Sequence, residues 1–234
     1  MRRGGCLIPI VFLCLVAGVW FFLSSPSFRL DSVIVEGVVN VESERIEELL
    51  DLEGGTHLYS ISLARLEERI CVDPRVESAS VRRVIPGTLE IIVKERKPVA
   101  VVLRSGIFAE IDATGRVIEV HDTWPGLALP LITGVEIEKL QLGERALDID
   151  SLELEVASRL EGMRGIIEEI RSEDFGIVLI NSGGGEIWLS DIYPDTLKAL
   201  EVLTSEDIPL PDSGCVHDYR LPERPVRKCD RPKD

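Results

Sequence analysis

The sequence predicts an α+β protein with an N-terminal transmembrane helix, a small domain in the order strand, helix, helix, strand, strand, and a mixed β-rich domain with a C-terminal edge strand. The transmembrane helix is predicted by an uncharged apolar run from Cys6 to Leu23. The small domain is predicted by a hairpin pattern, in which apolar residues alternate on both sides of a turn at Pro86-Gly87. Pro98 has no backbone N–H for a sheet ladder, so it marks the boundary between the two domains.

The apolar run is interpreted as a transmembrane helix over residues 6–24, preceded by a cytoplasmic tail of residues 1–5. A helix of about 18 residues spans most of a ~30 Å hydrocarbon core. Arg2 and Arg3 precede the run, so the positive-inside rule predicts a single-pass type II protein of the cytoplasmic (inner) membrane with its body outside the cytoplasm. A cleaved signal peptide is the alternative, but this run is longer than the usual core of such a peptide.

Composition and charge exclude several functional classes. The 234 residues leave room for one or two compact domains, and the net charge of −15 repels phosphate backbones, so nucleic acid is not an expected partner. The chain has three histidines and lacks the Gly-x-Ser-x-Gly, His-Glu-x-x-His and paired-cysteine zinc patterns. We therefore expect no enzyme activity, catalytic residue, cofactor, metal or small-molecule substrate.

The first domain is predicted over residues 28–97. A β-branched run that ends at Gly37 forms its first strand. Two amphipathic helices follow. The first covers residues 41–52 and ends at the glycine pair that comes next, and the second is capped by Ser62. Both helices can cover one face of the three-stranded sheet that the hairpin completes. His57 lies in the loop between the helices without a second ligand of suitable spacing, so it is interpreted as a packing or solvent residue.

The second domain is predicted over residues 98–228, followed by a disordered tail over residues 229–234. Its glycine loop at residues 181–185 is interpreted as a turn, because a strand pattern and not a helix follows the glycines. The other expected elements are strands at 99–103, 106–111, 116–120 and 166–171, a helix at 149–163, a hairpin of 175–180 with 186–189, and a last helix that opens at Pro194.

Three cysteines follow the apolar run, and an odd number is not a disulfide framework. Cys215 and Cys229 could pair across a loop in an oxidising compartment, but their spacing alone does not establish that their Cα atoms are close, so two free thiols are the default expectation. Together with His217 they would offer three soft ligands to a metal, yet this spacing matches no site that we can defend.

The hairpin pattern from Val76 to Ala100 resembles the end of the POTRA domain in bacterial cell-division proteins of the FtsQ/DivIB family. The resemblance covers roughly residues 28–227, and its other motifs lie at 54–59, 107–117, 129–134 and 218–221. It implies a POTRA domain followed by an FtsQ-type β domain. It also implies a non-catalytic scaffold of the divisome at the septum, which recruits and regulates the septal cell-wall synthesis machinery through FtsB or DivIC and FtsL.

In this family, the exposed edge of the terminal strand receives FtsB or DivIC, and the segment 218–221 resembles part of that strand. Binding would then proceed by strand addition to unpaired backbone groups. Pro222 and Pro225 depart from the family pattern, since each removes a donor, so the pairing edge has to be short or use the other register. Alternatively, the prolines only protect an edge from aggregation. The implied partner contacts are Tyr219, Arg220, Leu221, Glu223, Arg224 and Val226.

Two other functional classes stay open from the sequence. A POTRA-type chaperone or secretion module anchored in the membrane would share the first domain, although such proteins carry POTRA repeats and this chain has one such unit. A membrane-anchored enzyme would show a deep pocket lined by ionisable groups with perturbed pKa values.

Overall fold

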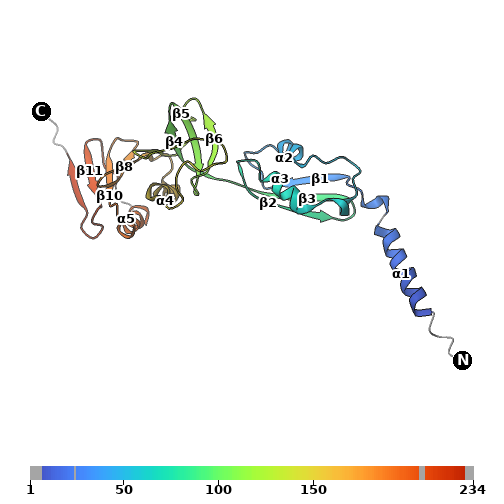
Figure 1. Ribbon diagram of the computed structural model, residues 1–234. Helices are drawn as coiled ribbons and strands as arrows, with labels where there is room; N and C mark the ends of the chain where they lie inside the picture. Colours follow the sequence, from blue (N-terminus) through green and yellow to red (C-terminus); the bar gives the residue numbers. More distant parts are fainter. Residues whose placement is uncertain (1–6, 24, 206–208, 230–234) are drawn as a thin grey trace. The chain divides into compact units, whose positions relative to one another are not determined.

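The computed structural model describes residues 7–23, 25–205 and 209–229 (Figure 1). The chain folds as two compact units, Met1–Glu95 and Arg96–Asp234, whereas the sequence places the division at Pro98. The predicted cytoplasmic tail over residues 1–5 lies outside the described residues. So do residues 230–234 of the predicted C-terminal tail, but Cys229 is the last residue of a strand.

The apolar N-terminal segment forms helix α1, Leu7–Leu23, which is 17 residues long and carries no charged residue. The predicted span over residues 6–24 extends one residue beyond this helix at each end, and both of those residues lie outside the described ones. Within the described part of the chain, no helix is both long enough and apolar enough to cross a membrane. The transmembrane span stays a prediction.

After α1, the first unit forms a three-stranded sheet with two helices, in the predicted order strand, helix, helix, strand, strand (Figure 1). Strand β3 is central, with β1 parallel to it on one side and β2 antiparallel on the other. The elements are the 3-10 turns η1 Pro26–Phe28 and η2 Leu58–Ser60, the strands β1 Ser32–Glu36, β2 Val76–Val84 and β3 Thr88–Glu95, and the helices α2 Ser43–Leu50 and α3 Leu63–Ile70.

The core of the first unit lies between one face of this sheet and the two helices. Along β3, Leu89, Ile91 and Val93 are buried and alternate with more exposed residues, as expected for a strand with one face against a core. Ile46 of α2 and Ile70 of α3 are fully buried in the same apolar cluster. The predicted hairpin therefore supplies the face on which both helices pack.

The first helix of this unit is shorter than predicted. The sequence assigns residues 41–52 to it, whereas it ends at Leu50 because Asp51 adopts a left-handed conformation with φ 50°. Arg69 of α3 donates a hydrogen bond of 2.7 Å to the carbonyl of Leu50, which satisfies one of the last carbonyls of α2. Ser62 occupies the N-cap position of α3 as predicted, but its side chain makes no capping hydrogen bond.

Glu95, at the end of β3, holds the loop that follows β1. Its Oε1 accepts the backbone N–H groups of Val39, Asn40 and Val41 at 2.6, 2.9 and 2.9 Å. Burial opposes ionisation, but these hydrogen bonds outweigh it and lower the pKa of Glu95. We expect Glu95→Gln to lower the free energy of unfolding by about 1 kcal/mol, because a neutral, partly exposed acceptor forms weaker hydrogen bonds than a carboxylate.

Urea unfolding of the full chain in detergent, followed by far-UV circular dichroism, measures this effect. Glu53→Gln is the control, because Glu53 is an exposed glutamate of the same unit. A carboxyl group with a lowered pKa contributes stability above its unfolded value and loses it as the pH falls, so the difference from wild type should shrink below about pH 4.5. Equal stabilities of the two variants at pH 7 would contradict the assigned role of Glu95.

The second unit is a nine-stranded mixed sheet with two helices packed on it (Figure 1). The strand order is β12-β11-β10-β9-β8-β7-β4-β5-β6, so β12 and β6 are the two edges. The pairs β4/β7, β7/β8 and β10/β11 are parallel and the others are antiparallel. The strands are β4 Pro98–Arg104, β5 Ile107–Asp112, β6 Val117–His121, β7 Leu131–Thr133, β8 Ile167–Glu173, β9 Gly176–Asn181, β10 Glu186–Leu189, β11 Cys215–Asp218 and β12 Val226–Cys229.

The helices of the second unit are α4 Leu152–Arg159, which continues as the 3-10 turn η3 Leu160–Met163, and α5 Tyr193–Ser205. The helix predicted over residues 149–163 therefore begins later, at Leu152, and its last four residues form a 3-10 turn instead of an α-helix. The helices contact each other, α4 packs on β4 and β8, and α5 packs on β10. Buried residues from both helices and from the sheet form one apolar core that includes Leu154, Ile170 and Leu200.

The glycine loop between β9 and β10 is a turn, as the sequence predicts. The Oδ1 of Asn181 accepts the backbone N–H groups of Gly183 and Gly185, each at 2.9 Å. Its Nδ2 donates to the carbonyl of Pro211 at 2.7 Å, which ties the turn to the segment before β11. Both polar atoms of the Asn181 side-chain amide are thus hydrogen-bonded to the backbone, which stabilises the turn.

Candidate partner-binding edge

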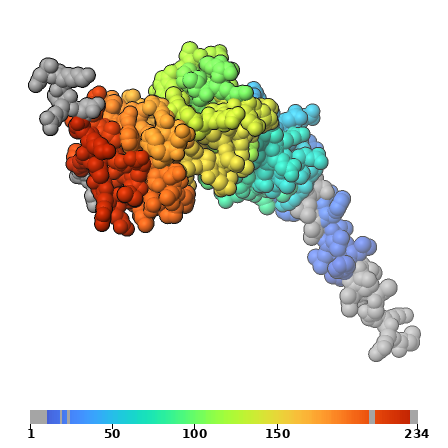
Figure 2. All heavy atoms as spheres, turned by 60° about the vertical axis from the view of Figure 1, so that its left-hand side comes forward, coloured from blue at the N-terminus to red at the C-terminus, as the bar shows by residue number. Residues whose placement is uncertain are grey.

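The last two strands form a hairpin at one edge of the nine-stranded sheet. Strand β11 lies parallel to β10, and β12 pairs antiparallel with β11. All four residues of β12 are exposed, and atoms of this C-terminal segment, red in Figure 2, lie at the surface of the second unit. The outer side of β12 therefore offers backbone groups to which another strand can add.

The structure corrects the position of the edge strand. The sequence places the segment 218–221 in the terminal strand, whereas β11 ends at Asp218 and residues 219–225 connect it to β12. Pro222 and Pro225 lie in this connection, so neither removes a donor from β12. The edge is short, as expected from the prolines, but each of its four residues keeps its N–H.

A disulfide joins Cys215 to Cys229, with an S–S distance of 2.03 Å and Cα atoms 4.0 Å apart. The register explains the bond, because these residues lie directly opposite each other across β11 and β12. The default expectation of two free thiols is therefore wrong, and neither thiol is left to bind a metal together with His217. The bond fixes one end of the edge strand to its neighbour.

Arg220, Asp218, Trp188 and Phe175 form a cluster beside this edge, which we call the Arg220 platform. The Nε and Nη2 of Arg220 donate to the two carboxylate oxygens of Asp218 at 2.9 and 2.7 Å. The guanidinium carbon also lies 5.0 Å from the ring centroid of Trp188 and 5.3 Å from that of Phe175. The hydrogen bonds from Arg220 lower the pKa of Asp218, and those to Asp218 raise the pKa of Arg220. Both groups stay charged near neutral pH, and the guanidinium is held in one place.

The other residues predicted to contact a partner differ in burial. Leu221 is 68% exposed and Val226 is 47% exposed, and Glu223 and Arg224 are exposed on the connection between them. Tyr219 is only 2% exposed and belongs to the core of the second unit. Its side chain therefore packs in the apolar core, and its contact with a partner stays a prediction.

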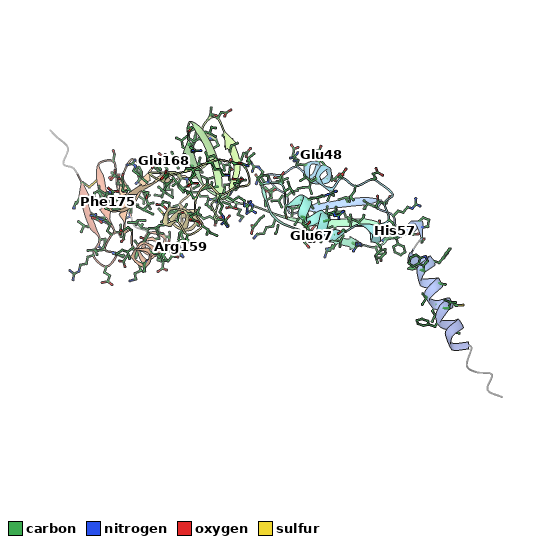
Figure 3. All side chains as sticks on the ribbon, in the orientation of Figure 1. Glu48, His57, Glu67, Arg159, Glu168 and Phe175 are labelled. Atoms are coloured by element: carbon green, nitrogen blue, oxygen red, sulfur yellow. A yellow bond between two sulfur atoms is a disulfide. The ribbon has the colours of Figure 1, made fainter. Side chains whose placement is uncertain are left out.

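Sequence reasoning missed Trp188 and Phe175. The parallel pairing of β10 with β11 places Trp188 beside Asp218, and Phe175, labelled in Figure 3, comes from the turn between β8 and β9. The alternation along β10, with Ile187 and Leu189 buried, was the available signal, because it turns Trp188 outward. The pairing itself joins segments that are distant in the sequence and leaves no local signal.

His217 lies in β11 and is 7% exposed, and its Nδ1 has no hydrogen-bond partner among the described residues. Burial lowers the pKa of His217, and the positive charge of Arg227, directly opposite on β12, lowers it further. A lowered pKa means that the folded hairpin favours the neutral imidazole. Protonation of His217 at low pH therefore opposes the packing of this edge.

The edge is basic although the chain is acidic. Arg224 lies in the connection before β12, and Arg227 and Lys228 lie within the strand, whereas the net charge of the whole chain is −15. Complementary charge steers association and fixes register. The edge therefore favours an acidic partner segment.

Comparisons with known proteins show what the chain is similar to. Residues 28–96 match the model of the FtsQ-type POTRA domain. The chain is 32% identical to the cell division protein FtsQ of Syntrophotalea carbinolica over 183 residues, which cover 75% of this chain and 64% of that protein. It is 28% identical to the cell division protein DivIB of Clostridium acetobutylicum over 138 residues, which cover 59% of this chain and 55% of that protein.

Among solved structures, the chain is similar to the major extracytoplasmic domain of the cell division protein DivIB from Geobacillus stearothermophilus, in its trans isomer. This match covers 50% of the present chain and 99% of that chain, with 15% identity and a TM-score of 0.30. The POTRA match and the two relatives confirm the resemblance found in the sequence. The chain therefore contains an FtsQ-type POTRA domain and is similar, over less than two thirds of their length, to bacterial cell-division proteins named FtsQ and DivIB.

Proposed function

We propose that the chain is a non-catalytic scaffold of the division machinery, which recruits and regulates septal cell-wall synthesis by binding partner division proteins. The observation that carries the proposal is the free edge of β12, which is flanked by exposed apolar and basic side chains. Two further findings support it: the FtsQ-type POTRA domain and the relatives named as cell division proteins.

The proposal includes an N-terminal anchor in the cytoplasmic membrane, with both units on its outer side. The uncharged α1 and the two arginines that precede it in the sequence favour this topology. The Cys215–Cys229 disulfide also favours it, because disulfides persist in oxidising compartments and are rare in the cytoplasm. The protein would then act at the outer face of the membrane at the division septum.

Binding would proceed by strand addition to β12. A partner segment, supplied by the cognate FtsB or DivIC with FtsL in the same complex, would hydrogen-bond to the outer side of β12. Leu221 and Val226, both exposed, would provide apolar contacts beside the backbone pairing. The Arg220 platform would provide a rigid aromatic and cationic surface, of the kind enriched among residues that dominate binding energy.

We expect Leu221→Glu and Val226→Glu each to weaken binding of the cognate FtsB or DivIC at least tenfold, a loss of ~1.4 kcal/mol. Each change replaces an exposed apolar side chain by an acidic one at an edge that favours acidic partners. Pull-down and calorimetry with the full chain in detergent measure the affinity. Leu142→Glu is the matched control, because Leu142 is an exposed leucine, 49% accessible, in a loop of the same unit.

The same variants test the role in cells. Depletion of the protein should produce filamentous cells, and wild type and Leu142→Glu should restore division whereas the double variant Leu221→Glu/Val226→Glu should not. Normal division after depletion would contradict the division role. Filamentation with full rescue by the double variant, and unchanged affinity, would instead contradict the assignment of this edge.

A further inference from the structure

Three side chains with metal-binding groups meet on one face of the β5–β6 hairpin. Glu110 of β5 lies directly opposite Glu119 of β6, and His121 follows two positions further along β6 on the same face. One ligand atom from each of the three lies within 4.8 Å of the other two. The two strands belong to the edge of the second unit opposite β12, so the cluster is separate from the proposed partner-binding edge.

The distances within the cluster suit a single small ion. The Nε2 of His121 is hydrogen-bonded to Oε1 of Glu110 at 2.7 Å and lies 4.0 Å from Oε2 of Glu119. Zinc binds nitrogen and oxygen at roughly 2.0–2.2 Å, so two tetrahedral ligand atoms lie about 3.4 Å apart. Each observed separation differs from that value by less than about 1 Å, which carboxylate side-chain rotation can accommodate.

The charges of the cluster also favour a cation. The carboxylate of Glu110 is 5% exposed, and it faces a second carboxylate at a directly opposed position, where like charges destabilise a sheet. A divalent cation bound between the two carboxyl groups would offset this repulsion. Phe108 lies directly opposite His121 and packs edge-on against Trp124 with ring centroids 5.7 Å apart, so apolar side chains border the cluster.

We propose that Glu110, Glu119 and His121 bind a divalent transition-metal ion of the zinc class. One imidazole nitrogen and two carboxylate oxygens are donors that such ions accept, and three protein ligands leave a coordination position for water or another group. Calcium and magnesium prefer sites made of oxygen atoms alone, so the imidazole selects against them. The ion would join β5 to β6 at this edge of the sheet, independently of the proposed division role.

Isothermal titration of the metal-free full chain in detergent with zinc chloride tests the proposal, with excess calcium present to occupy exposed carboxylates. We expect one zinc ion per chain, with an affinity that falls at least tenfold in His121→Ala and in Glu119→Gln. Asp122→Asn and Cys71→Ser should bind as wild type does, because Asp122 is an exposed acid next to the cluster and Cys71 is an exposed free thiol. Zinc should also raise the melting temperature of wild type and not that of Glu119→Gln.

Glu119→Gln is the decisive variant, because the Glu119 side chain is 38% exposed and glutamine keeps its size, so we expect the variant to fold. If Glu110→Gln or His121→Ala fails to fold, the comparison of Glu119→Gln with Asp122→Asn still decides. Absence of zinc binding at this site, binding that Glu119→Gln leaves unchanged, or displacement of zinc by calcium would each overturn the proposal.

Discussion

Asp112→Ala is expected to lower the free energy of unfolding of the second unit by about 3 kcal/mol, because it removes a buried carboxylate and the partner of a largely buried guanidinium. Asp112 is 5% exposed, and its Oδ2 accepts a hydrogen bond of 2.7 Å from Arg96. Its Oδ1 accepts the backbone N–H groups of Thr114 at 2.8 Å and Arg116 at 3.0 Å, which closes the turn between β5 and β6. One carboxylate thus ties the start of the unit to the turn between β5 and β6.

Urea unfolding followed by the fluorescence of Trp124 and Trp188, both in the second unit, measures the loss. Burial alone would raise the pKa of Asp112, but its hydrogen bonds outweigh burial and lower it. The ionised carboxylate therefore stabilises the wild type above about pH 3.8, and this contribution is lost as the pH falls further. The difference in stability between wild type and variant should shrink over the same range. Asp122→Ala, at an exposed aspartate, is the control, and a similar stability for both variants at pH 7 would refute the role of Asp112.

Elements whose parts are neighbours in the sequence could be predicted. The hairpin of β2 and β3 was predictable because its strands and its Pro86-Gly87 turn are contiguous, and alternation alone decides which face of each strand is buried. Helix ends were less predictable. Helix α2 ends at Leu50 because the next residue, Asp51, adopts a left-handed conformation although it is not a glycine, and this end comes before the glycine pair that the pattern favoured.

The order of strands in the second unit could not be predicted, because its parallel pairs join distant segments. Strand β7 lies between β4 and β8, and β11 lies beside β10 across the whole of α5. The disulfide and the Arg220 platform both depend on these pairings. Cys215 lies opposite Cys229 because the chain reverses direction at residues 219–225. Trp188 contacts Arg220 because β10 pairs in parallel with β11.

Tyr219→Ala is expected to destabilise the second unit by about 3 kcal/mol and, through that loss, to weaken partner binding. The side chain is 2% exposed within the core, so its truncation leaves a cavity that the surrounding sheet fills only in part. The backbone N–H of Tyr219 donates to the carbonyl of Trp188 at 2.8 Å, so this residue continues the pairing of β11 with β10. Loss of its ring would loosen the connection from which Leu221 projects.

Comparison with Tyr219→Phe and Leu221→Glu separates packing from contact. Tyr219→Phe keeps the ring and should retain most of the stability and the binding, whereas Leu221→Glu, at an exposed side chain, should lose binding at unchanged stability. The same urea titration, combined with calorimetry against the proposed partner, the cognate FtsB or DivIC, measures both quantities. If Tyr219→Ala weakened binding without any loss of stability, Tyr219 would be a direct contact, and the hairpin would have to expose it when the partner binds.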